Sequence, residues 1–327
     1  MHSMASAWSD PRWERIRELQ LAKEQHVTRQ HVVSRVLLQR FTAPGKGSSG
    51  KQLEVFDLAH PERPPRLKGP RGCGWVENFA SFASGSLEVL WGQTEQRAPA
   101  ALAAVDERRP FDDPSHGDVL RDLVALHLVR SIRFQRVHHN ALLRTLERLK
   151  RNLVEENGEI LKQVVQRDYG LHITGQGAME FFADRVLERT ERAYSAGQLF
   201  RVSLESMFSK VRQAIAKDWQ LEVLTPQDGP FIIGDTPAVT LRIDKKVTFG
   251  MALGDAHSVL LPVGPRRMLA LGPENVLGTL ALHKVIMSNA AQVLAADRYV
   301  FAQPGSNMQR FIRRAGARRA SSGQASE

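Results

Sequence analysis

The sequence predicts a mainly helical α+β protein whose C-terminal third adds a small, mostly antiparallel sheet. Apolar residues recur at helical spacing through most of residues 86–219. After Gln220 they gather instead in short β-branched and aliphatic runs separated by turn residues. The 327 residues include 42% hydrophobic and 24% charged side chains, a globular balance that allows a sizeable core.

The first two-thirds of the chain carries the expected helices. Trp13, Ile16 and Leu19 recur at near-helical spacing, and Pro11 suits a first helical turn. Further helices are predicted at residues 29–41, 86–105 and 118–149 (one helix or two), in a stretch around Gly158 that runs to residue 167, and at residues 178–219 with a weak point at 195–197.

Strands are expected mainly in the last third. They are predicted at residues 51–58, 221–224, 231–233, 238–243, 258–263, 268–271 and 299–302. A last helix is predicted over residues 277–295. The domain organisation that follows is a basic N-terminal helix over 1–30, one α+β domain over 31–305 and a disordered Arg-rich tail over 306–327.

The formal net charge of +10 lies mostly at the two ends of the chain. Residues 1–40 carry a net +3 and residues 306–327 a net +4, so the body between them is only weakly basic. A globular nucleic-acid-binding protein usually has a basic face on its folded body. The more economical interpretation is therefore a solvated N-terminal helix and a disordered Arg-rich tail, and binding of nucleic acid through these basic termini is the alternative.

Composition also bears on the compartment. Cys73 is the single cysteine, so no disulfide framework can form within one chain, and a reducing cytoplasm is expected. No apolar run approaches the ~18 residues that span a bilayer, and the first ten residues lack the pattern of a secretory signal. We expect a soluble, cytoplasmic protein with no membrane partner.

The first candidate site residue is His31, at the start of an apolar run that we predict to be helical. Its imidazole titrates near neutrality, so it could act as a general acid or base or as a metal ligand. The alternative is a helix-capping or core histidine with its hydrogen bonds satisfied.

Glu88 and Glu95 are the second candidates. Their spacing of seven residues, about two helical turns, places both carboxylates on nearly the same face of one predicted helix. Paired carboxylates can hold a divalent cation such as Mg²⁺ or Mn²⁺, or divide the roles of acid and base. They could equally be surface glutamates that form salt bridges, for example with Arg97.

Arg130 and Asp235 complete the set. Arg130 shares a helix face with His127, and its guanidinium could bind a phosphate or carboxylate, or pair with Glu95 or Asp235. Asp235 ends an apolar run and precedes Thr236-Pro237, a position typical of site residues and also of Asx-turns.

These stretches, in order, resemble a largely bacterial family of unknown function, DUF4238. His31-Val32-Val33-Ser34 with the later Leu38-Gln39-Arg40-Phe41 resembles the family's opening His-x-Val-Pro and Leu-x-x-Phe elements, although Ser34 replaces the usual proline. Glu88, Glu95, Arg130 and the segment 234–237 resemble its paired glutamates, its helical arginine and its strand ending in Ser-Asp-x-Pro. The segment 261–265 and Asn289 resemble a Pro-Leu-Ser-Pro-like strand and the asparagine of the closing helix. The resemblance implies a fold and a set of positions over about 31–302, and it implies no reaction.

Two functions follow as hypotheses. In the first, the chain is a hydrolase acting on a phosphoester or nucleic acid, with His31, Glu95, Arg130 and Asp235 as catalytic residues and Glu88, Glu95 and Asp235 as metal ligands. In the second, the same His/Glu/Arg/Asp set is a structural ion-pair network in a non-catalytic interaction module.

Overall fold

The computed structural model describes residues 11–45, 50–243, 247–250, 253–254 and 256–321. Contacts within the chain divide it into two compact units. The sequence analysis predicted a single domain over residues 31–305. The helical unit comprises residues 1–26, 80–84 and 135–203, and the sheet-bearing unit comprises residues 27–79, 85–134 and 204–327. Each unit is therefore built from segments that are far apart in the sequence.

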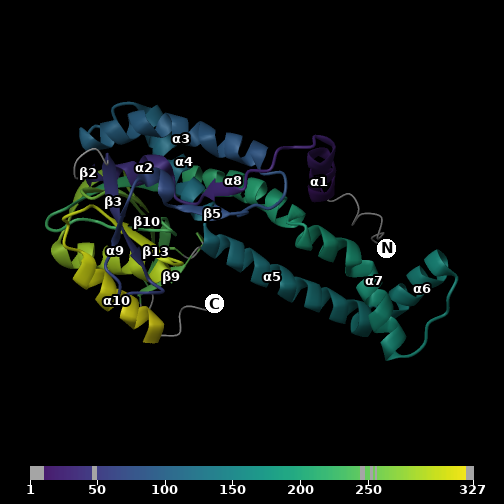
Figure 1. Cartoon of the computed structure of the whole chain (residues 1–327). Helices are drawn as coiled ribbons and strands as arrows, with labels where there is room; N and C mark the ends of the chain where they lie inside the picture. Colours follow the sequence, from purple (N-terminus) through teal and green to yellow (C-terminus); the bar gives the residue numbers. More distant parts are fainter. Residues whose placement is uncertain (1–10, 46–49, 244–246, 251–252, 255, 322–327) are drawn as a thin grey trace. The chain divides into compact units, whose positions relative to one another are not determined.

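The helical unit is built from helices (Figure 1). Its elements are α1 (Pro11–Leu21), most of α5 (Ile132–Arg151), a π-helical turn (Asn152–Glu156), α6 (Gly158–Tyr169), α7 (Gln176–Ser195) and the start of α8 (Gln198–Asp218). Ile16 and Leu19 of α1 are buried against Ala193 of α7 and Leu199 of α8. This contact confirms the predicted helical face of α1, although the helix ends at Leu21.

Three sheets replace the single small sheet that the sequence predicts, and all belong to the sheet-bearing unit. A six-stranded mixed sheet has the order β12-β6-β11-β10-β8-β9, in which only β12 and β6 run parallel. Its strands are β6 (Gln220–Pro226), β8 (Val239–Ile243), β9 (Val247–Gly250), β10 (Ser258–Gly264), β11 (Arg267–Gly272) and β12 (Val276–Leu280).

A five-stranded antiparallel sheet has the order β2-β3-β13-β7, with β4 paired to β3. Its strands are β2 (Ala43–Pro44), β3 (Lys51–Asp57), β4 (Arg66–Lys68), β7 (Ile233–Gly234) and β13 (Tyr299–Ala302). The third sheet is the antiparallel pair β1 (Arg29–His31) and β5 (Trp75–Glu77). A short 3₁₀ turn (Pro70–Gly72) precedes β5.

Helices cover these sheets. Helix α9 (Leu282–Ala295) buries Val285 against the six-stranded sheet and Val293 against the five-stranded one. Helix α10 (Gln309–Ser321) packs beside it, as the yellow helices near β3 and β13 show (Figure 1). Helices α3 (Gly85–Asp106) and α4 (Pro114–Val129) pack against each other, and α2 (Arg35–Arg40) contacts α3.

Three element predictions were wrong. Residues 29–31 pair with β5, so the helix predicted over 29–41 shrinks to α2. Residues 276–280 pair with β6, so the helix predicted over 277–295 begins only at Leu282. Residues 309–321 form α10 where a disordered tail was expected, because Ile312 is buried against the five-stranded sheet; residues 322–327 lie outside the described part. In each case a tertiary partner decided the local structure.

Candidate functional site

Four of the five predicted site residues belong to one electrostatic cluster in the sheet-bearing unit. Glu88 and Glu95 lie on α3, Arg130 caps the end of α4, and His31 ends β1. Glu88 lies two helical turns before Glu95 on α3. Burial is the main cause of the pKa shifts of His31 and Glu88, and the charges of Arg130 and Glu95 also act on both.

Arg130 is the centre of this cluster. Its side chain is only 1% exposed, and its Nη2 donates to Glu95 Oε1 and, at 2.7 Å, to the hydroxyl of Ser34. Its guanidinium lies 5.2 Å from the centre of the Trp91 ring, a cation–π contact. An arginine buried this deeply requires a compensating charge, and Glu95 supplies it.

Ser34 closes the network. Its hydroxyl donates to Glu95 Oε1 at 2.5 Å while accepting from Arg130. The three side chains thus link the β1–α2 connection, α3 and the end of α4. Ser34, which we noted only because it replaces a proline in the family pattern, is a member of the site that the sequence did not reveal.

His127 supports the network from one helical turn before Arg130. Its Nδ1 lies 2.8 Å from the carbonyl oxygen of Leu123 and therefore donates, so its Nε2 accepts the backbone N–H of Ser34 at 3.1 Å. Burial, with the nearby Arg130 charge, lowers the pKa of His127 to about 4, and the ring is neutral at pH 7. Its acceptor faces the Ser34 backbone, so His127 does not activate the serine hydroxyl as a general base would.

The two glutamates differ in environment. Burial raises the pKa of Glu88, the Glu95 charge adds to this, and Arg130 only partly opposes it. Burial also acts to raise the pKa of Glu95, but Arg130 and the Ser34 hydroxyl outweigh it and the net shift is downward. The pKa values of the two carboxyls therefore move apart: Glu88 holds its proton more tightly than an exposed glutamate does, and Glu95 is held ionised.

Several polar atoms of the cluster have no hydrogen-bond partner among the described residues. They are His31 Nε2, Glu88 Oε1, Trp91 Nε1 and Arg130 Nε, and all four are buried. Unpaired buried polar atoms are costly, so such a group indicates a place for a bound molecule or water. Trp91 and Arg130 carry obligate donors, which indicates that the missing partner offers acceptor atoms.

Asp235 is not part of this cluster. Its carboxylate accepts the backbone N–H groups of Asp297, Arg298 and Tyr299 at 2.6, 2.8 and 2.7 Å, and thereby fixes the start of β13. Among the described residues it has no hydrogen bond to His31, Glu95 or Arg130. Burial raises its pKa to about 6 despite these bonds. These bonds give Asp235 a structural role in the β7–β13 connection, and the catalytic role predicted for it stays a prediction.

The structure does not bring the predicted metal set Glu88, Glu95 and Asp235 together. No group of three or more His, Cys, Asp or Glu side chains able to hold a metal ion occurs among the described residues. The reason is that Glu95 is engaged by Arg130 and Ser34, and Asp235 by backbone amides.

The fold and this cluster define an α+β protein with a buried Ser–Glu–Arg network beside two unsatisfied titratable groups. The model of one protein family matches residues 29–306, and the chain belongs to that family, whose description is protein of unknown function (DUF4238). No curated protein and no solved structure matches the chain. Among the described residues, no helix is both long and apolar enough to cross a membrane.

Proposed function

We propose that the chain is a hydrolase that acts on a phosphoester bond, with Glu88 and His31 as the proton-transferring pair beside Arg130. The observation that carries the proposal is the set of four buried, unpartnered polar atoms on His31, Glu88, Trp91 and Arg130. Two of them can only donate, and phosphoryl oxygens are strong acceptors.

The pKa directions suit a division of labour between these groups. Burial, with the Arg130 charge, lowers the pKa of His31, so its imidazole is neutral near pH 7 and can accept a proton. Burial raises the pKa of Glu88, which makes its carboxyl the better proton donor of the two glutamates. In the proposed step His31 Nε2 takes the proton of the attacking water, the new P–O bond forms, and Glu88 protonates the leaving oxygen as the old P–O bond breaks.

Arg130 and Trp91 would hold the phosphoryl oxygens in this scheme. The Nε–H of Arg130 and the indole N–H of Trp91 are available for this, while Nη2 of Arg130 remains paired with Glu95 and Ser34. Because that pairing fixes the guanidinium, its direction is set before a substrate arrives, as electrostatic stabilisation of a transition state requires.

The experiment compares the wild type with Glu88→Gln and His31→Gln in assays of phosphomonoester, phosphodiester and oligonucleotide hydrolysis. Removing a general acid or base lowers the rate by about 10²–10⁴-fold, so each variant should lose at least about a hundredfold in kcat. Exposed Arg97, which lies on the same helix and makes no hydrogen bond among the described residues, provides the control Arg97→Gln. The proposal is wrong if the wild type hydrolyses none of these substrates, or if its hydrolysis survives in both variants.

The second candidate is an interaction module in which the network is purely structural. The observation in its favour is the mutual pairing of Glu95, Arg130 and Ser34, which joins three separate segments. This function predicts that the wild type shows no hydrolysis, and that Glu88→Gln and His31→Gln change stability little because neither side chain takes part in the Glu95–Arg130–Ser34 pairing.

A further inference from the structure

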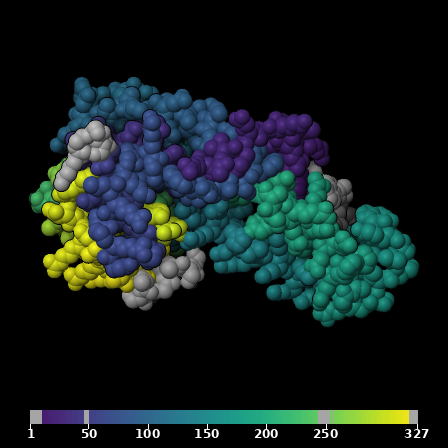
Figure 2. Space-filling view, in the orientation of Figure 1, coloured from purple at the N-terminus to yellow at the C-terminus, as the bar shows by residue number. Residues whose placement is uncertain are grey.

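A cavity lies within the helical unit, and none of its lining residues belongs to the proposed hydrolase site. It has a volume of about 590 Å³ and is bounded by α1 and α7 and by the residues that lead into α8. Figure 2 shows α1, in purple, beside the green helices of this unit. A cavity of a few hundred Å³ has the size of a small-ligand pocket.

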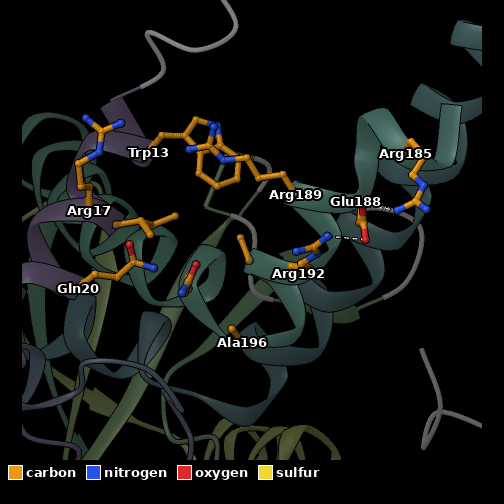
Figure 3. Close-up of a pocket in the computed structure, with 11 residues that line it drawn as sticks. Trp13, Arg17, Gln20, Arg185, Glu188, Arg189, Arg192 and Ala196 are labelled. Atoms are coloured by element: carbon orange, nitrogen blue, oxygen red, sulfur yellow. Dashed lines mark hydrogen bonds and ion pairs between the residues drawn. The ribbon is translucent and has the colours of Figure 1, made fainter. Parts of the chain in front are cut away.

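The lining of this cavity is strongly basic. Arginines 17, 185, 189 and 192 line it, and Glu188 is the one acidic residue among its lining residues (Figure 3). The lining therefore carries a formal charge of +3. All four arginine side chains are exposed and reach solvent, so a charged ligand can approach them.

Glu188 neutralises only part of this charge. Its carboxylate pairs with Arg192 at 2.5 Å and with Arg185 at 3.3 Å. Arg17, on the opposite wall, makes no hydrogen bond or ion pair among the described residues. Salt bridges at such exposed positions contribute little to stability, so stability alone gives no reason to gather four arginines here.

Trp13 provides an aromatic wall. The guanidinium of Arg189 lies 4.5 Å from the centre of the Trp13 ring, and both point toward the same space in Figure 3. The half-buried Trp13 packs against the apolar cluster that contains Ile16 and Ala193. The ring thus holds Arg189 beside the cavity from a fixed position.

We infer that this pocket binds phosphate groups of nucleotides, either free or joined in a single strand. Planar guanidinium groups bind phosphate oxygens through paired hydrogen bonds, and several of them together suit a ligand that carries more than one negative charge. A basic groove that includes an aromatic side chain is the usual composition of a site for single-stranded nucleic acid. The inference does not depend on the proposed hydrolysis, because it uses no residue of that site.

The test is fluorescence anisotropy of a labelled oligo(dT) strand over a series of salt concentrations, with ATP and tripolyphosphate as competitors. Arg17→Gln should weaken binding about tenfold and lower the slope of log affinity against log salt by about 0.7, the loss of one phosphate contact. Glu188→Gln should instead tighten binding several-fold, because it releases Arg185 and Arg192 from their carboxylate. A purely structural role for these residues does not predict opposite signs.

The competitors distinguish the two sources of phosphate. Binding of oligo(dT) that ATP and tripolyphosphate displace only weakly supports a strand, and equal displacement by either supports a free phosphorylated ligand. The matched control Arg97→Gln makes the same charge change on α3 and should leave binding unaltered. No binding of any probe, or equal weakening by Arg17→Gln and Arg97→Gln, would overturn the inference, and the melting temperature of each variant shows that it is folded.

Discussion

At the scale of single residues, the decisive feature is the buried guanidinium of Arg130. It is compensated by Glu95 on α3 and by Ser34 before α2, two residues that lie 35 and 96 positions away in the sequence. A buried ion pair adds little over an apolar pair of the same volume, but removing one partner leaves an uncompensated charge.

Breaking this pair is therefore predicted to be costly. Glu95→Gln should lower the free energy of unfolding by about 3 kcal/mol, at the lower end of the usual range because Glu95 is 29% exposed and keeps some contact with water. The double variant Arg130→Met with Glu95→Gln should lose less free energy of unfolding than the two single variants lose together, by about 1 kcal/mol or more. Urea unfolding of the four proteins measures both quantities, and strict additivity would contradict the pairing.

Residue types and spacing could predict part of this site. Glu88, Glu95 and Arg130 were recognisable because two helical turns separate the glutamates and a charged residue interrupts an apolar helix. Ser34 and Trp91 could not be recognised, because a serine before a helix and a tryptophan on its apolar face look like a cap and a core residue. The backbone hydrogen bonds of Asp235 could not be predicted, because a strand-end aspartate that accepts backbone amides has the same local sequence as one that faces a ligand.

At the scale of elements, α10 differs most from expectation. Its five arginines predicted disorder, yet Ile312 is only 1% exposed and packs with Phe56, Ile232 and Val300. The charged composition concealed a short apolar stripe, since Phe311 and Ala315 pack against the same cluster as Ile312. The order of this helix comes from that contact with the five-stranded sheet.

Truncating the contact tests this account of α10. Ile312→Ala should destabilise the protein by about 2–5 kcal/mol, since it opens a cavity in a buried cluster. The exposed Arg314 on the same helix provides the control, and Arg314→Ala should change stability by less than about 0.5 kcal/mol. Equal, negligible effects of the two variants in thermal unfolding would mean that the segment does not pack as described.

The strand β12 shows a similar limit of sequence patterns. Residues 277–280 continue the apolar pattern of α9 and were assigned to it, but they belong to β12, which pairs in parallel with β6. That pairing joins residues about fifty positions apart in the sequence, and the local spacing of apolar residues does not predict it. The antiparallel strands β8, β10 and β11 were predicted within one or two residues at each end, because turns separate them clearly.

At the scale of the whole molecule, the chain forms two units from interleaved segments, which no composition change marks in the sequence. The α+β class could be predicted because helical and strand patterns occupy different thirds of the chain. The division into units could not, because it depends on which helices pack together.

A property of the whole molecule, the pH dependence of its stability, follows from buried titratable groups. The folded-state pKa of His127, about 4, lies below its unfolded value near 6.5, so the unfolded chain binds more protons between these values. This contribution to stability is complete above about pH 6.5 and is lost as the pH falls toward 4. Asp235 acts in the opposite direction, because its folded-state pKa is raised to about 6 and its contribution is lost as the pH rises through that value.

His127 and Asp235 change the stability in opposite directions as the pH falls. A variant that removes His127 is therefore needed to measure its contribution alone. His127→Gln should be less stable than the wild type at pH 7, and the difference between the two should shrink by about 1.4 kcal/mol for each pH unit in which only the unfolded histidine is charged. Urea unfolding of both proteins at several pH values from pH 7 to pH 4.5 measures this difference in the free energy of unfolding. A difference that stays constant over this range would show that His127 is not buried in its neutral form.

The measurement that tests the central claim most directly is the carboxyl titration of Glu88 and Glu95 by NMR, with Glu88→Gln and Glu95→Gln used to assign the two signals. The account predicts that Glu88 titrates above the exposed glutamates of the same chain, because it is buried, and that Glu95 titrates below them, because Arg130 and Ser34 hold it ionised. Two glutamates that titrate together with the exposed ones, or in the reverse order, would contradict the division of roles on which the proposed site rests.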